Sequence, residues 1–108
     1  MINSFTPSQL RNLDRNYFIV YEASPFLIIL KSKSTSHFWR IFPDKNQYSL
    51  LHSHQGDCNY HFQCNCKSLE VAIKKIRQHD RYQLTYRCKE NNDFDYIPCL
   101  PDEEYFVF

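Results

Sequence analysis

Five short runs rich in β-branched and aromatic residues follow one another between positions 17 and 66, and they constrain the fold more than any other feature of the chain. Their lengths suit strands rather than helices, and turn-forming residues separate them. The runs are residues 17–21, 26–30, 37–42, 48–54 and 59–66. Because strands joined by short turns pair antiparallel, we expect the last three to form a meander, with residues 43–46 as a four-residue hairpin connection.

A short helix is predicted before these strands. Thr6 is a suitable N-cap, Pro7 suits the first helical position, and Gln9 completes a capping box with Thr6. Asn16 provides a plausible end. We therefore expect a short packing helix near the N-terminus.

A second helix is predicted after the strands, with Ser68 as its N-cap. Helical spacing relates the apolar residues that follow, Leu69, Ala72, Ile73 and Ile76. This spacing predicts that a helix over residues 68–80 packs on the sheet. The alternating pattern of residues 82–88 predicts a final strand.

Together these elements predict an α+β fold, a single small domain over residues 1–108. We expect an antiparallel sheet of about five or six strands, with one amphipathic helix on a face and the short N-terminal helix at an edge. The predicted core includes Ile19, Ile28, Leu30, Trp39, Ile41, Phe62, Leu69, Ile73 and Ile76.

The cellular compartment is predicted from the lack of a recognisable membrane span or secretory signal in the sequence. No apolar run approaches the roughly 20 residues of a membrane span, and residues 1–4 do not resemble the start of a secretory signal. An odd number of cysteines favours reduced thiols over disulfides; they are Cys58, Cys64, Cys66, Cys88 and Cys99. We expect a cytoplasmic protein without membrane contact.

Charge is distributed unevenly. All thirteen Lys and Arg residues lie at or before Lys89, where six acids accompany them, so that this part carries about +7. Residues 90–108 contain six acids and no Lys or Arg, and carry about −6. We expect this acidic segment to pack on the oppositely charged body.

The single glycine of the chain limits the chemistry that it can perform. Phosphate-cradling loops, dinucleotide fingerprints and serine elbows all need glycines at fixed positions. The chain also has no His-Glu-x-x-His sequence. We therefore expect a protein that is not an enzyme and has no cofactor.

A zinc site is one alternative. If residues 56–57 form a two-residue turn, His52 faces His61 across two strands and His54 lies diagonally on the same face, an arrangement that zinc can use. Six of the ten Cys and His residues fall in this part of the sequence, namely His52, His54, Cys58, His61, Cys64 and Cys66.

A three-residue turn leads to a different structure. It would pair His52 with Phe62 and Leu50 with Cys64, and would separate the imidazoles. The single residue between Cys64 and Cys66 also differs from the spacing of ordinary zinc modules. In that case the cysteines are core residues and the histidines are half-exposed.

Nucleic-acid binding is a second alternative. The predicted second helix and its flanks carry a dense group of cations that could contact phosphates, namely Lys67, Lys74, Lys75, Arg77 and Arg81. Trp39 and Arg40, flanked by Phe38 and Phe42, are candidates for stacking on bases, although the rings could equally fill the two sides of a buried strand.

The leading interpretation is a small binding or regulatory protein without catalytic activity, an interaction module or inhibitor that docks on a larger protein. Inhibitors encoded by mobile genetic elements often have this type of sequence, and the aromatic content suits interfaces as well as cores. The contact could be the basic helix or an acidic surface that mimics nucleic acid, namely Asp93, Asp95, Asp102, Glu103 and Glu104. A homodimer through a free sheet edge is a further alternative.

Overall fold

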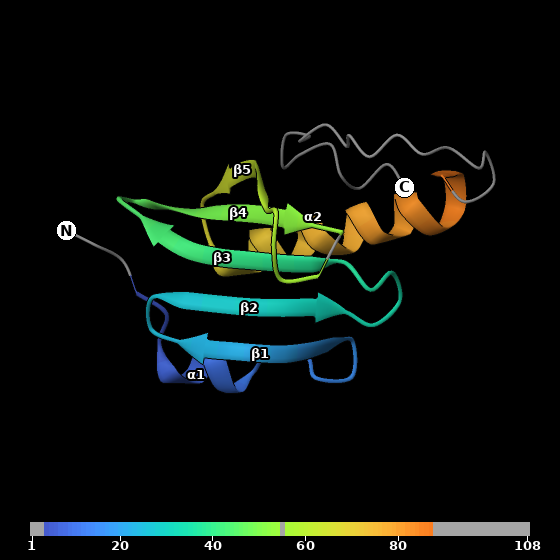
Figure 1. Ribbon diagram of the computed structural model, residues 1–108. Helices are drawn as coiled ribbons and strands as arrows, with labels where there is room; N and C mark the ends of the chain where they lie inside the picture. Colours follow the sequence, from blue (N-terminus) through green and yellow to red (C-terminus); the bar gives the residue numbers. More distant parts are fainter. Residues whose placement is uncertain (1–3, 55, 88–108) are drawn as a thin grey trace.

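The computed structural model describes residues 4–54 and 56–87, which form one α+β domain. A five-stranded antiparallel sheet has the order β1-β2-β3-β4-β5, so that each strand pairs with the next one along the chain (Figure 1). The elements are α1 (Pro7–Arg11), β1 (Phe18–Ser24), β2 (Leu27–Ser32), β3 (Phe38–Asp44), β4 (Gln47–Ser53), β5 (His61–Cys66) and α2 (Leu69–Tyr82), followed by a π-helical turn (Gln83–Arg87). The predicted fold class is confirmed.

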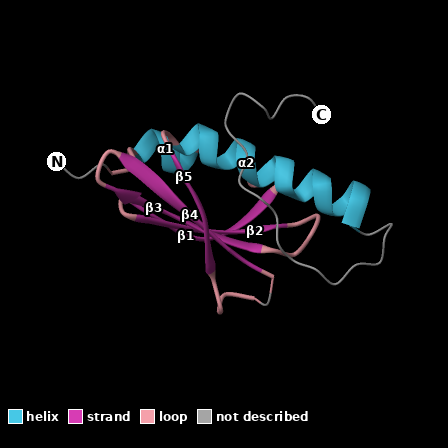
Figure 2. Ribbon diagram, turned by 90° about the horizontal axis from the view of Figure 1, so that it is seen from above, coloured by secondary structure: helices cyan, strands magenta, loops and turns pink. Residues whose placement is uncertain are grey.

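Both helices lie on the same side of the sheet, as Figure 2 shows. Helix α2 packs against β3, β4 and β5, and α1 lies near β1 (Figure 1). The backbone N–H of Phe5 donates to the carbonyl of Pro25 and ties the N-terminal segment to the β1–β2 turn. The domain therefore has two layers, and within the described residues no helix covers the other face of the sheet.

Helix α1 begins as the capping signals predict. The Thr6 side chain accepts from the backbone N–H of Gln9 at 3.1 Å, and the Gln9 side chain accepts from the backbone N–H of Thr6 at 2.9 Å. The helix ends at Arg11, with Asn12 as its C-cap, so it is shorter than the expected end at Asn16. Its basic Arg11 lies in the last turn, where the helix dipole favours a cation.

The β3–β4 hairpin is tighter than predicted. Asp44 pairs with Gln47, so the turn contains two residues, Lys45 and Asn46, instead of the expected four. Lys45 has φ 60, the left-handed conformation that two-residue hairpin turns require. Pro43 belongs to β3, where its side chain occupies a strand position.

The β4–β5 pair contains both of the registers considered above. His52 pairs with His61, as the two-residue turn predicts, whereas Leu50 pairs with Cys64, as the three-residue turn predicts. A β-bulge between these pairs inserts one extra residue into β5 and joins the two registers. The bulge also places Phe62 on the sheet face opposite Cys64.

Helix α2 is longer than predicted. The prediction of a final strand at residues 82–88 is wrong for residues 82–87, the part of it that the structure describes. The Ser68 side chain accepts from the backbone N–H of Val71 at 3.1 Å, which confirms the N-cap. At the other end residues 81–87 contain neither Gly nor Pro, and Gln83 still has right-handed helical angles. Because nothing interrupts the backbone hydrogen bonds, the helix continues to Tyr82 and into the π-helical turn.

The core lies between the sheet and the helices. Of the predicted core residues, Ile28, Leu30, Trp39, Ile41, Leu69 and Ile76 are buried, and Ile73 is partly buried. Two predictions are wrong, because Ile19 is 39% exposed and Phe62 is 59% exposed. Strand alternation turns Phe18 inward and Ile19 outward, and the β5 bulge turns Phe62 outward.

Candidate functional sites: an open sheet face and a histidine cluster

The face of the sheet that turns away from both helices is called here the open sheet face. Tyr21, on the edge strand β1, is 54% exposed, and Phe62, on the opposite edge strand β5, is 59% exposed. Strand register, and the Tyr21–Phe38 ring contact, place on this face polar residues such as Glu22, Ser49 and Ser53 together with nine apolar or basic residues: Ile19, Tyr21, Ile29, Lys31, Phe38, Arg40, Phe42, Leu51 and Phe62.

Aromatic rings on the open sheet face stack on each other and on cations. The rings of Tyr21 and Phe38 are stacked with centroids 5.4 Å apart, and the Lys31 amine lies 5.7 Å from the Phe38 centroid. The Arg40 guanidinium lies 4.7 Å from the centroid of the Tyr60 ring. Trp39, considered above as a stacking residue, is fully buried on the opposite face.

Arg40 is also paired with a carboxylate. Its Nη2 atom lies 3.2 Å from Oδ1 of Asp57, and the Tyr60 hydroxyl donates to the same oxygen. The pKa of Asp57 is lowered, first by the hydrogen bond from Tyr60 and then by Arg40. The loop between β4 and β5 therefore supplies the counter-charge for the cation on β3.

The second feature is a cluster of histidine rings at one end of the sheet, called here the histidine cluster. His52 is central to it, and its ring centroid lies between 4.4 and 5.6 Å from those of the other four. Three structural elements meet here: the end of the β3–β4 ladder, the start of β5 and the last turns of α2. The cluster contains every histidine of the chain, namely His37, His52, His54, His61 and His79.

His52 contacts a neighbouring histidine through each ring nitrogen. Its Nε2 atom lies 3.0 Å from Nδ1 of His37, and its Nδ1 atom lies 3.2 Å from Nε2 of His61. The Trp39 ring packs against it with centroids 4.4 Å apart. Burial lowers the pKa of His52 to about 2, with smaller effects from the neighbouring imidazoles, so the ring is neutral at ordinary pH.

His79 is buried on α2, with only 5% of its surface exposed. Within the described residues, neither of its ring nitrogens makes a hydrogen bond. Its Nδ1 atom lies 3.8 Å from Oδ1 of the buried Asp80, too far for a hydrogen bond. The ring instead packs against Trp39 and His52.

Asp80 is anchored by two side chains from distant parts of the chain. The Tyr17 hydroxyl donates to its Oδ2 atom at 2.6 Å, and the Thr35 hydroxyl donates to its Oδ1 atom at 3.0 Å. The pKa of Tyr17 is raised, first by burial and then by this hydrogen bond. Asp80 thus connects α2 to the segments on either side of the β1–β2 hairpin.

Three histidines have ligand atoms close enough to hold a metal ion. One nitrogen from each of His37, His52 and His79 lies within 4.8 Å of the other two. The sequence-based set was His52, His54 and His61, whose rings do lie near each other, with centroids 5.0 to 6.2 Å apart. The structure brings these three together and adds His37 and His79.

One sequence signal could have identified His79. It continues the spacing of the buried residues of α2, which are Leu69, Ala72, Ile76, His79 and Asp80, so it belongs to the face that packs on the sheet. His37 has a weaker signal. It lies two residues before Trp39, just ahead of β3, so strand alternation places it on the same face as Trp39, which pairs with His52.

The basic residues proposed to contact a partner lie mostly on the outer side of α2. Lys67, Lys74 and Arg81 are exposed, and Lys75 is half-buried. Arg77 lies 3.6 Å from a carboxylate oxygen of Asp14 and stacks over the Tyr17 ring. The acidic candidates Asp93, Asp95, Asp102, Glu103 and Glu104 lie outside the described residues.

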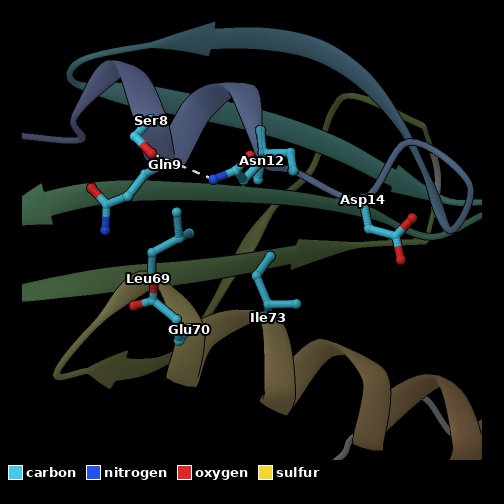
Figure 3. Close-up of a pocket in the computed structure, with 8 residues that line it drawn as sticks. Ser8, Gln9, Asn12, Asp14, Leu69, Glu70 and Ile73 are labelled. Atoms are coloured by element: carbon cyan, nitrogen blue, oxygen red, sulfur yellow. Dashed lines mark hydrogen bonds between the residues drawn. The ribbon is translucent and has the colours of Figure 1, made fainter.

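A groove of about 410 Å³ separates α1 from the first turns of α2. Figure 3 shows Leu69 and Ile73 of α2 pointing toward α1. Ser8, Gln9, Asn12, Leu13, Asp14 and Glu70 complete its lining. The lining contains neither histidine nor cysteine.

Helix length and hydropathy identify no membrane-spanning helix in the described part of the chain. Comparison with known proteins found no match to this chain among family models, curated proteins or solved structures.

Proposed function

We propose that this protein is an interaction module that docks on a larger protein through the open sheet face. The observation that carries this proposal is that three exposed apolar side chains, Ile19, Tyr21 and Phe62, lie on the one sheet face that no described helix covers. A sheet normally buries its apolar face against another layer. The missing layer is, in this proposal, supplied by the partner.

The charges on the open sheet face favour an apolar protein surface as the occupant. Affinity for nucleic acid comes largely from cations that neutralise phosphates. Arg40 is already paired with Asp57, and the Lys31 amine lies over the Phe38 ring. A partner with the apolar stripe of an amphipathic helix suits this surface, because such a helix completes a third layer on the sheet.

The experiment compares two phenylalanines with the same exposure. Phe62 on the open sheet face and Phe26 in the β1–β2 turn are both 59% exposed. Phe62→Ser and Phe26→Ser therefore remove similar apolar areas at different places. The tagged wild-type protein and both variants are incubated with lysate, either untreated or treated with nuclease, and the retained proteins and nucleic acid are measured.

We expect one protein to be retained in stoichiometric amount by the wild type and by Phe26→Ser, and to be lost with Phe62→Ser. Equal retention by all three would contradict docking through this face. A dimer of the purified protein that dissociates on Phe62→Ser would identify a second copy as the occupant. Retention of nucleic acid alone, abolished by Lys74→Glu, would favour the basic helix instead.

A further inference from the structure

The histidine cluster leaves a buried polar group without a partner. His79 is 5% exposed, and neither of its ring nitrogens makes a hydrogen bond within the described residues. Leaving a buried polar group unpaired costs about 1–3 kcal/mol. Such groups are rare in native proteins and often mark a bound water or ion.

The contacts of His52 leave one of its ring nitrogens available to a metal ion. A metal ligand must be a neutral imidazole with a free lone pair. His52 is buried among other imidazoles, with its Nε2 atom 3.0 Å from His37 and its Nδ1 atom 3.2 Å from His61. A neutral ring has one N–H group, so His52 can donate through only one of its two contacts, to His37 or to His61. The other nitrogen of His52 keeps a lone pair for a ligand bond.

We propose that His37, His52 and His79 together bind a divalent transition-metal ion of the zinc type. The Nδ1 atom of His37 and the Nε2 atom of His52 are 3.0 Å apart. Two nitrogens bound to one tetrahedral zinc ion are about 3.3 Å apart. All three ligand atoms lie within 4.8 Å of one another, so side-chain movements of about 1 Å bring them to this geometry. Imidazole nitrogen suits zinc, copper and nickel better than it suits magnesium or calcium.

The groups around the three ligands fit a metal site as well. With Nε2 of His52 on the metal, its Nδ1–H group donates to Nε2 of His61, 3.2 Å away. With Nε2 of His79 on the metal, its Nδ1–H group would be 3.8 Å from Oδ1 of Asp80, and a side-chain movement of about 1 Å would bring it to hydrogen-bond distance. Ligand histidines usually donate their second N–H to such an acceptor, which fixes the orientation of the ring. Asp80 also offsets part of the charge of the ion.

The proposed ion would join three elements that are distant in the sequence. His37 precedes β3, His52 belongs to β4, and His79 lies in the last turn of α2. The metal would therefore attach α2 to the sheet at the end where Asp80 is already held by Tyr17 and Thr35. This site lies in the core and is separate from the open sheet face, so it goes beyond the proposed interaction function.

The test measures zinc affinity of the full chain, purified without a polyhistidine tag and stripped with a chelator. Zinc chloride is titrated in competition with a chromogenic chelator. We expect one zinc per chain. His37→Gln or His79→Gln should lower the zinc affinity by more than about 100-fold, which exceeds the effect of changing a residue that only hydrogen-bonds to a ligand. For His61→Gln we expect a loss of about 10- to 100-fold.

His54→Gln is the matched control, because His54 belongs to the cluster but not to the three ligands. Its affinity should equal that of the wild type. Trp39 provides a second readout, because its ring lies 4.4 Å from His52 and 4.9 Å from His79. Copper or nickel ions bound at this site should quench its fluorescence with the same stoichiometry as zinc.

His79→Leu keeps the proposal falsifiable if polar variants do not fold. Leucine removes the unpaired nitrogens, so the metal-free variant should be at least as stable as the metal-free wild type. Zinc should then raise the melting temperature of the wild type but not of His79→Leu. No stoichiometric zinc, equal affinity in all variants, or equal affinity in urea-unfolded protein would overturn the proposal.

Discussion

Removing one hydroxyl group tests how strongly the Tyr17–Asp80 contact holds α2 to the rest of the domain. Tyr17→Phe deletes the donor to Oδ2 of Asp80 but keeps the ring that packs on Phe18 and Arg77. Asp80 is 1% exposed, so water does not readily replace the lost donor. Hydrogen bonds to buried charged groups contribute about 1.5–3 kcal/mol, and we expect a loss of about 2 kcal/mol in the free energy of unfolding.

The matched control is Tyr60→Phe. Its hydroxyl also donates to a carboxylate, that of Asp57, but the side chain of Asp57 is 45% exposed. Water can replace this donor, so we expect a loss of at most about 0.5 kcal/mol. The two variants remove the same chemical group, and the difference between them measures the effect of burial.

Urea unfolding followed by Trp39 fluorescence measures both variants, because Trp39 is the single tryptophan and is fully buried. For a urea m-value of about 1.5 kcal/mol/M, a loss of 2 kcal/mol lowers the midpoint by about 1.3 M. The control should shift by about 0.3 M or less. Equal shifts for both variants would refute the reasoning that burial determines the strength of these contacts.

Two further predictions concern the core and the histidine cluster. Leu50→Ala, at a fully buried position, should lower the free energy of unfolding by about 2–5 kcal/mol. Leu51→Ala, on the open sheet face, should lower it by less than about 1.5 kcal/mol. Equal losses in urea unfolding would contradict the assignment of these two residues to opposite faces. In the metal-free protein, stability should fall as the pH is lowered below about 6.5, because unfolded His52 binds a proton there while folded His52, with its pKa lowered to about 2, does not. His52 alone changes the free energy of unfolding by up to about 1.4 kcal/mol per pH unit. Urea midpoints that are unchanged between pH 7 and pH 5 would contradict this prediction.

Much of the fold could be predicted because its signals are local. The N-cap residues, the strand-length apolar runs and the apolar spacing of α2 depend on neighbouring residues, and each corresponds to an observed element. Local signals were insufficient at residues 82–87. There the alternating pattern favoured a strand, but helix α2 had no residue to end it and continued.

The candidate sites depend on contacts that local patterns do not contain. The β5 bulge combines two registers, and this combination brings His61 opposite His52 while turning Phe62 outward. A register shift of one residue reverses the face of each side chain, so the outward position of Phe62 could not be predicted. His37 and His79 join the cluster only through the packing of β3 and α2.

The strand order of the sheet also determines how the chain can fold. Each strand pairs with the one made just before it, so the sheet can grow by adding one hairpin at a time. Sheets built from such local contacts have low contact order and fold faster than those that pair distant strands. During synthesis the five strands can therefore assemble before α2 leaves the ribosome, whereas the histidine cluster is complete only after residue 79 has emerged.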